Sequence, residues 1–175
     1  MSSSFGFYRG KFEERDGTAS RFRVLLFVEL PDRMHAEVVP PMGGPRLILD
    51  GGGGKLAVAI VDRRTAYLGD AGADSVRKAI GAPVSLSSLV RALVLGERPE
   101  DPELAMAREP AEGPGFPEVF ELRWRGRVLR IDLVRMQPVR GLATLGSGTP
   151  PEGFQVRPMD EIGEDWGPLL GGGEP

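Results

Sequence analysis

Few side chains in this sequence have the types and spacing that catalysis or metal binding requires. His35 is the only histidine, and the chain contains no cysteine. A general base needs a nucleophile and an orienting partner, and a protein metal site usually needs several ligands. Because His35 alternates with Arg33 and Glu37, we expect it on the solvated side of a strand. The sequence therefore predicts no catalytic residue, no metal and no other cofactor, and we do not expect an enzyme.

Two further groups of residues could do chemistry but have a simpler reading. Gly51–Gly54 is glycine-rich like a phosphate-binding loop, yet such a loop leads into a helix, and Lys55 opens an expected strand instead. We therefore expect a turn at these glycines. Glu100, Asp101 and Glu103 could act as paired carboxylates, but they lie in a Pro-rich segment without the apolar surroundings that separate two pKa values. We expect a solvated loop there.

A stripe of arginines surrounds one tryptophan, at Arg123, Trp124, Arg125, Arg127 and Arg130. Such interleaving can bind single-stranded nucleic acid or anionic headgroups. The arginines follow the alternation of strands, however, and Trp124 points to the opposite side, so we expect a solvated outer face. With a net charge of -3, the chain has no strong field for nucleic acid, and we expect no nucleic-acid partner.

One loop carries a large apolar side chain between two expected strands. Its sequence is Pro40-Pro41-Met42-Gly43-Gly44-Pro45. Loops normally run over the surface because their backbone needs water. Met42 therefore either folds back onto the core or is offered to something outside the protein.

The elements around these residues predict a mainly β fold with helices. Six strands with short links form an antiparallel meander, two short helices follow, and strands return afterwards. We expect strands near 5–14, 19–30, 33–39, 45–50, 55–61, 65–68, 118–125, 127–136 and 153–158. We expect helices near 75–79 and 86–95. Residues 97–117 are expected to form a loop with one helical turn near 103–107.

The strand at 19–30 and the helix at 86–95 are the most apolar parts of the chain. Leu25 and Phe27 make the middle of the strand apolar on both faces, which indicates a strand covered on both sides. Leu86, Leu89, Val90 and Leu93 recur at helical spacing behind a predicted Ser85 cap. The strand and helix either pack as an ordinary core or enclose an apolar cavity. The residues expected to line that cavity are Leu25, Phe27, Leu86, Leu89, Val90, Leu93 and Trp124.

The length of 175 residues predicts one domain, over residues 1–158, and a Gly/Pro-rich extended tail over 159–175. Trp166, Leu169 and Leu170 are possible anchors of this tail. Hydrophobic residues make up 41% and charged residues 27% of the chain, as in ordinary globular proteins. No apolar run is long enough to span a bilayer.

Five segments in order resemble the LolB-like outer-membrane lipoprotein receptor family, whose fold is shared by LolA and LolB. The segments are Tyr8–Phe12, Pro31–Met34, Pro41–Gly44, Ala79–Leu89 and Leu93–Gly96. They correspond to the strand–RG–strand, "DRYR"-like strand, "NPLG" loop, "LTGxPxPLxxL" helix junction and "WILG" helix end of the family. The likeness covers about residues 5–98 and fades in the C-terminal third, where only the strand pattern agrees.

The resemblance implies a curved antiparallel half-barrel of eleven strands, with two or three short helices as a lid over an apolar cavity. It implies a receptor that takes lipoprotein acyl chains from a periplasmic LolA-like carrier and inserts them into the inner leaflet of the outer membrane. Its membrane-insertion loop corresponds to Pro41, Met42, Gly43 and Gly44, with Met42 where the family has leucine.

The same resemblance implies a monomer at the periplasmic face of the outer membrane, with a lipid anchor in the native form. The anchor cysteine and the signal are not in the printed chain. The alternative is a LolB-like envelope lipoprotein that serves as a structural or assembly module, or that binds another hydrophobic ligand.

Overall fold

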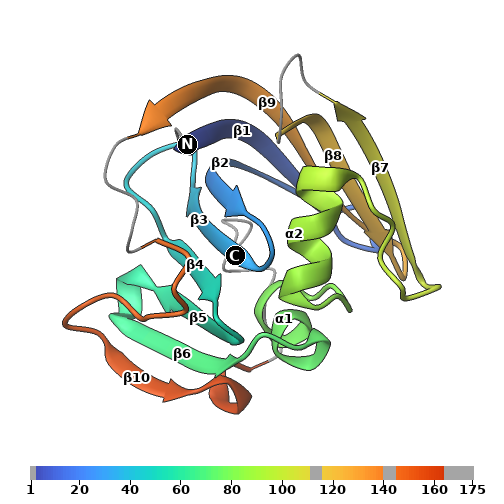
Figure 1. Cartoon of the computed structure of the whole chain (residues 1–175). Coiled ribbons are helices and arrows are strands. Elements are labelled where there is room, and N and C mark those ends of the chain that lie inside the picture. Colours follow the sequence, from blue (N-terminus) through green and yellow to red (C-terminus); the bar gives the residue numbers. More distant parts are fainter. Residues whose placement is uncertain (1–2, 111–115, 140–144, 164–175) are drawn as a thin grey trace.

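A curved antiparallel sheet wraps around two helices in the computed structural model, which describes residues 3–110, 116–139 and 145–163 (Figure 1). The strands are β1 (Ser3–Glu13), β2 (Ala19–Glu29), β3 (Arg33–Val39), β4 (Leu47–Gly52), β5 (Lys55–Ile60), β6 (Thr65–Asp70), β7 (Leu104–Pro110), β8 (Pro117–Trp124), β9 (Arg127–Val139) and β10 (Gln155–Pro158). The helices are α1 (Ala73–Ile80) and α2 (Leu86–Leu95), with short 3-10 helices η1 (Val61–Arg63) and η2 (Met159–Glu161). The predicted class, mainly β with a helical lid on a curved antiparallel sheet, is confirmed.

The order of the strands explains why the helices lie inside the curve. β1 to β6 form the predicted meander, while β7, β8 and β9 form a second one, and β9 pairs with β1. The two meanders therefore place β6 and β7 far apart, and the chain between them crosses the concave face as α1 and α2. The described strands number ten, where the resemblance implies eleven, and β10 joins the far side by pairing parallel to β6.

Strand alternation supplies the concave face with its apolar side chains. In β2, Phe22, Val24 and Leu26 are buried towards the helices, while Arg21 and Arg23 are exposed on the convex face. Each fully buried side chain of this size contributes roughly 1.5–3 kcal/mol. The concave face of the sheet therefore forms one core with the helices.

α2 spans the predicted residues 86–95, while α1 begins at Ala73, two residues before its expected start near residue 75. α1 ends at Gly81 and α2 at Gly96, each in the left-handed conformation that glycine adopts without strain. Ser85 caps α2 by accepting a hydrogen bond from the Ser88 N–H at 3.3 Å. Leu86 of α2 packs directly on the backbone of β4, because its Cδ2 atom lies 2.4 Å from where a Cβ on Gly51 would stand. Glycine at this position therefore lets the helix sit close to the sheet.

The segment 97–117 differs from its prediction. It contains the strand β7 instead of a loop with a helical turn near 103–107. Its alanines and glutamates favour a helix locally, but Leu104 and Met106 turn inwards as β7 pairs along the edge of β8. Tertiary pairing has overridden local propensity here.

The start of the expected tail folds against α1. Met159 in η2 is buried, and Lys78 of α1 pairs with Asp160 at 2.5 Å. Trp166, Leu169 and Leu170, the possible anchors, lie outside the described residues.

The sheet stays open, so it has two edge strands. β10 has four residues and ends at Pro158, and β7 ends at Pro110. The register of β1 with β9 shifts between Phe7 and Tyr8, where β9 has one extra residue, Val134. Such irregularities increase the local curvature of a sheet.

We predict that Ser85→Ala lowers the free energy of unfolding by about 1 kcal/mol, because α2 loses its N-terminal cap. Urea denaturation measures this change. Ser87→Ala is the matched control: Ser87 is exposed on the first turn of α2 and caps no backbone group in the described structure. Equal losses in the two variants would contradict the capping role.

Candidate functional site: an apolar cavity under a helical lid

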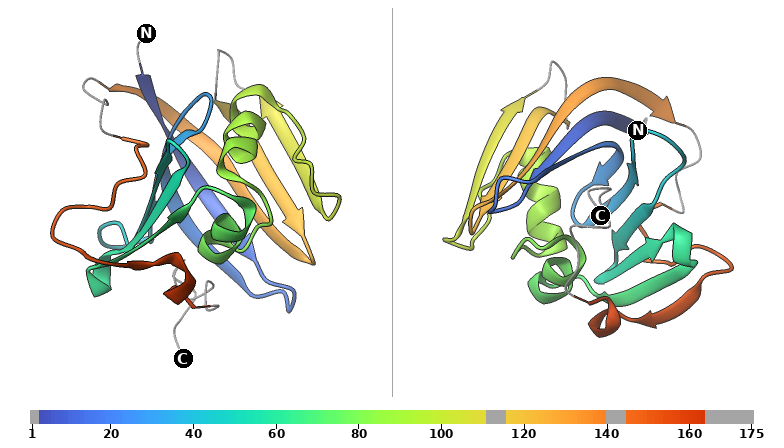
Figure 2. Two further views of the ribbon diagram at one scale, coloured as in Figure 1. Left: turned by 60° about the horizontal axis from the view of Figure 1, so that its bottom comes forward. Right: turned by 180° about the vertical axis from the view of Figure 1, so that it is seen from behind.

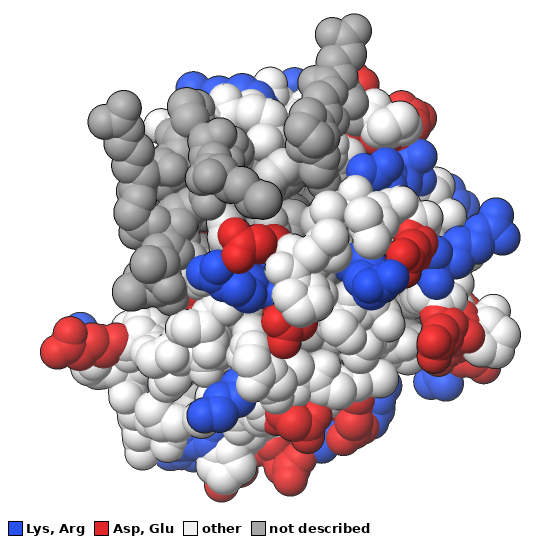
Figure 3. Space-filling model, in the orientation of Figure 1, with Lys and Arg blue, Asp and Glu red and all other residues white. Residues whose placement is uncertain are grey.

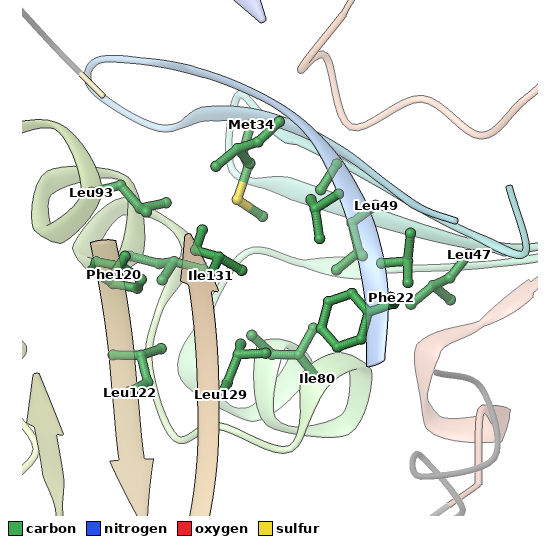
Figure 4. Close-up of a pocket in the computed structure, with 15 residues that line it drawn as sticks. Phe22, Met34, Leu47, Leu49, Ile80, Leu93, Phe120, Leu122, Leu129 and Ile131 are labelled. Carbon is green, nitrogen blue, oxygen red and sulfur yellow. The ribbon is translucent and has the colours of Figure 1, made fainter. Parts of the chain in front are cut away.

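A cavity of about 100 Å³ lies between the concave face of the sheet and the helices (Figure 4). Fifteen apolar side chains line it, from β2, β3 and β4 on one wall, β8 and β9 on the other, and α1 and α2 across the opening. They are Phe22, Val24, Leu26, Met34, Ala36, Val38, Leu47, Leu49, Ile80, Leu89, Leu93, Phe120, Leu122, Leu129 and Ile131. A site without polar side chains can bind only apolar matter, because nothing in it would replace the hydrogen bonds of a polar ligand.

Of the residues expected to line the cavity, some line it, some are buried outside the lining, and two lie on the convex face of the sheet. Leu89 and Leu93 line it from α2. Leu86 and Val90 are buried on the same helix but lie outside the lining, and Leu86 packs on β4. Trp124 is also buried, with its ring centroid 6.2 Å from that of Phe12.

Leu25 and Phe27 lie on the convex face instead. Phe27 is buried there against Phe5, with ring centroids 6.1 Å apart, and beneath the guanidinium group of Arg33. The neighbouring residues Phe22, Val24 and Leu26 hold the cavity side of β2. Their strict alternation, repeated in β3 by Met34, Ala36 and Val38, is the sequence signal that identifies the cavity face.

The cavity is small for a lipid tail while the lid is closed. An engineered cavity of about 150 Å³ is known to accommodate benzene, so about 100 Å³ holds only a short stretch of hydrocarbon. A whole acyl chain can enter only if α2 moves outwards or the lining side chains rearrange. Flexible Met34 lies in the lining, and methionine adapts well to such changes.

A single arginine fastens the C-terminal end of the lid to the sheet. Arg108 of β7 donates from Nε to the Leu93 carbonyl at 3.0 Å and from a terminal nitrogen to the Val94 carbonyl at 3.3 Å. The last carbonyls of a helix have no partner within the helix, and a cation favours the negative end of its dipole. Arg108 therefore holds the closed position of α2.

The Met42 loop is exposed along its tip. Pro41, Met42, Gly43 and Gly44 are all exposed, and Met42 keeps 85% of its surface accessible. Of the two alternatives for this side chain, the structure thus has the one that is offered outwards. The base of the loop is braced by Arg23, whose terminal nitrogen lies 3.3 Å from the Pro40 carbonyl.

The prediction that His35 is solvated was wrong. His35 is buried on the convex face, where Nδ1 lies 2.8 Å from Asp50 Oδ2 and Nε2 lies 3.1 Å from Glu37 Oε1. Burial alone would lower the pKa of His35, but hydrogen bonds to Asp50 and Glu37 and their charges raise it to about 9. The imidazolium form therefore predominates at neutral pH, and both ring nitrogens donate to carboxylates instead of activating a nucleophile.

Asp50 also fixes a strap, which we define as residues 145–149, across the convex side of the sheet. Its carboxylate accepts the backbone N–H groups of Gly146, Ser147, Gly148 and Thr149 at 2.9, 2.8, 2.7 and 3.4 Å. Burial alone would raise the pKa of Asp50, yet hydrogen bonds from His35, Gly146 and Gly148 hold it below its usual value. Figure 2 shows this part of the chain on the opposite side of the sheet from α1 and α2. The cluster of His35, Glu37 and Asp50 thus stabilises the fold by holding the strap on the sheet.

The arginine stripe singled out in the sequence is neutralised. The pairs are Arg123 with Glu121, Arg125 with Glu103, Arg127 with Glu14 and Arg130 with Asp132, at 2.5, 2.9, 3.0 and 2.8 Å. On the face of the molecule shown in Figure 3, charges of both signs are interspersed with uncharged surface. The stripe therefore has little free positive charge to offer a nucleic acid or a lipid.

Comparisons with known proteins do not assign the chain to a family. No family model matches it, and no curated protein matches it either. Among the described residues, no helix is long and apolar enough to cross a membrane, and no group of three or more histidine, cysteine or acidic side chains is placed to hold a metal ion. A function must therefore be argued from the cavity, the lid and the exposed loop.

We predict that the stability of the protein falls between about pH 6.5 and pH 9. The folded pKa of His35, about 9, lies above its ordinary value of 6.5, so the stabilisation is complete below the lower value and is lost as pH rises through the higher one. The loss should be about 3 kcal/mol. On the acid side, the lowered pKa of Asp50 makes stability fall as this carboxylate becomes protonated. Urea denaturation at a series of pH values measures the free energy of unfolding on both the alkaline and the acid side.

His35→Asn is the control for the alkaline arm, because an amide near the Nδ1 position still donates to Asp50 but does not titrate. It should flatten the slope between pH 6.5 and 9, and because His35 is the only histidine, no other imidazole contributes. An unchanged slope in this variant would contradict the assignment.

Proposed function

We propose that the protein is a LolB-like lipoprotein receptor that binds the acyl chains of lipoproteins in its cavity and delivers them to the outer membrane. The observation that carries this proposal is the cavity itself, lined by apolar side chains alone and covered by a helical lid. The exposed Met42 tip and the order of motifs that resembles the family support it.

The physical need for such a cavity follows from the cost of an acyl chain in water. Each exposed methylene costs roughly 0.8 kcal/mol, so a chain of about fourteen methylenes costs on the order of 11 kcal/mol. A lipoprotein cannot cross an aqueous compartment at a useful rate unless its chains are shielded. Binding in a dry apolar cavity recovers most of that free energy without any polar anchor.

The lid supplies a route for entry and release. α2 covers the cavity with Leu89 and Leu93 and is held at its C-terminal end by Arg108. Release of these two hydrogen bonds frees the end of the helix without breaking the sheet. Acyl chains then enter as the lid lifts, and the cavity enlarges around them.

The Met42 loop supplies the contact with the receiving membrane. One methionine contributes about 1.5–3 kcal/mol when it is fully buried, which biases orientation but does not anchor a protein. A separate lipid anchor, as the resemblance implies, then keeps the protein at the periplasmic face of the outer membrane. The partners on this proposal are a LolA-like carrier, the lipoprotein acyl chains and the inner leaflet.

One observation favours a second candidate, a structural or assembly module of the same fold. The cavity volume of about 100 Å³ is small for a lipid carrier and would suit a packed scaffold. Native mass spectrometry of the purified protein separates the two. Bound acyl lipid supports the receptor, and a consistently empty interior, together with failure to accept a lipoprotein from a carrier, supports the scaffold.

We predict that Ala36→Phe weakens binding of a fluorescent fatty acid at least tenfold. Ala36 lines the cavity, so a phenyl ring there would occupy the space that the hydrocarbon needs, at a stability cost of about 1–3 kcal/mol. Fluorescence titration measures the affinity, and a thermal melt checks the fold. Ala105→Phe adds the same atoms at an exposed position of β7 and should leave the affinity unchanged. Unchanged affinity of Ala36→Phe for the fatty acid would contradict the proposal that the cavity binds the acyl chain.

We predict that Met42→Glu leaves the melting temperature near that of the wild type, because Met42 is 85% exposed. It should weaken vesicle binding and lipoprotein delivery about tenfold or more, since a charge replaces the apolar tip. Vesicle sedimentation and a transfer assay measure these effects. Val156→Glu, at another exposed apolar residue on β10, is the matched control. A large drop in the melting temperature of Met42→Glu would show that Met42 is a core residue and would contradict its proposed contact with the membrane.

A further inference from the structure

Four cationic side chains face one another across β1 and β2. Arg9 lies directly opposite Arg23, and Lys11 lies opposite Arg21. All four are on the convex face, because Gly10 and Phe22, the cross-strand pair between them, point towards the core. Like charges directly opposite in a sheet destabilise it. The arrangement therefore has an energetic cost that nothing in the core explains.

The described residues do not neutralise three of these charges. Lys11 is paired with Glu13 at 2.5 Å, but no described carboxylate lies within ion-pair distance of Arg9, Arg21 or Arg23. We call these three residues the basic face. In contrast to the neutralised stripe on β8 and β9, it keeps its positive charge.

The acidic residues nearest to the basic face are already engaged. Asp132 is the register partner of Arg9 on β9, yet its carboxylate binds Arg130 at 2.8 Å. Glu37, one strand beyond Leu25, is held by His35. A counter-charge for the basic face must therefore come largely from outside the described residues.

The basic face adjoins the exposed Met42 loop. Arg23 is the register partner of Val39 at the end of β3, and it also contacts the carbonyl of Pro40. Figures 1 and 2 show the link between β3 and β4 bulging away from the sheet on the side opposite α1 and α2. At the far end of the loop, Arg46 is half exposed and lies 3.9 Å from Asp62. Cationic groups thus surround the base of an apolar tip.

We propose that the basic face docks the protein on an anionic phospholipid surface, where lipid phosphates supply the missing counter-charges and Met42 enters the apolar layer. This inference rests on the proposed function and names the lipid class of the receiving membrane. Guanidinium groups match phosphate oxygens in a bidentate geometry. The half-buried apolar side chains of Phe7 and Leu25 continue the same face, which suits the mixed character of a membrane interface.

The experiment compares two triple variants of the full chain in vesicle sedimentation. Arg9→Gln, Arg21→Gln and Arg23→Gln together remove the basic face, while Arg123→Gln, Arg125→Gln and Arg127→Gln remove three paired charges and give the same net charge. Vesicles of phosphatidylcholine alone and of phosphatidylcholine with phosphatidylglycerol are used, at low and high salt. We expect the first variant to lose about a hundredfold in affinity for the anionic vesicles, and the second to lose little.

Binding of the wild type should weaken as salt rises, because the contact is electrostatic. Equal losses in the two variants, no preference for anionic vesicles, or tighter binding to a single-stranded oligonucleotide than to vesicles would each overturn the proposal. Folding is checked by thermal melting, and the first variant should melt at the same or a higher temperature because like-charge repulsion is removed. Arg21→Gln alone, at an exposed position, gives a second measurement with little risk to the fold.

Acyl lipid bound in the cavity, measured by native mass spectrometry, separates this inference from the proposed function. If the protein retains acyl lipid but its vesicle binding does not depend on the basic face, the docking proposal alone is overturned. If vesicle binding depends on the basic face while the cavity stays empty and the protein accepts no lipoprotein from a carrier, the receptor function is overturned and the docking face is supported.

Discussion

The seating of α2 in the concavity of the sheet is the constraint on which the remaining structure depends. The two meanders leave β6 and β7 far apart, so the connecting chain has to cross the concave face. Leu86 can approach β4 only because Gly51 has no side chain in its way. The position of the helix then determines the space that remains beside Leu89 and Leu93, and that space is the cavity.

Local signals were sufficient for much of the fold. The serine cap of α2 acts within a few residues, and the structure has this cap as predicted. β7 was missed because its own composition favours a helix, and only its pairing with β8, the next strand along the chain, makes it a strand. The pairing of one strand with another is information that the composition of a single segment does not show.

The site was harder to predict for the same reason. His35 looked solvated because its neighbours in β3 are charged, but its burial depends on Asp50 of β4 and on a strap nearly a hundred residues further along the chain. The arginine stripe looked basic partly because two of its carboxylate partners, Glu103 for Arg125 and Glu14 for Arg127, come from segments distant in the chain. Conversely, the repulsive pair Arg9 and Arg23 becomes visible only once the register of β1 and β2 is known.

The openness of the sheet has a consequence for how the protein behaves at high concentration. A closed barrel has a circumference fixed by its strand number and shear, whereas an open sheet can change its curvature and so let a cavity widen. The same openness leaves two rows of unpaired backbone groups, which invite other chains to add as further strands. Here one edge is a four-residue strand that ends in Pro158, and the other ends in Pro110. Short edge strands that end in proline therefore protect this open sheet against edge-to-edge polymerisation.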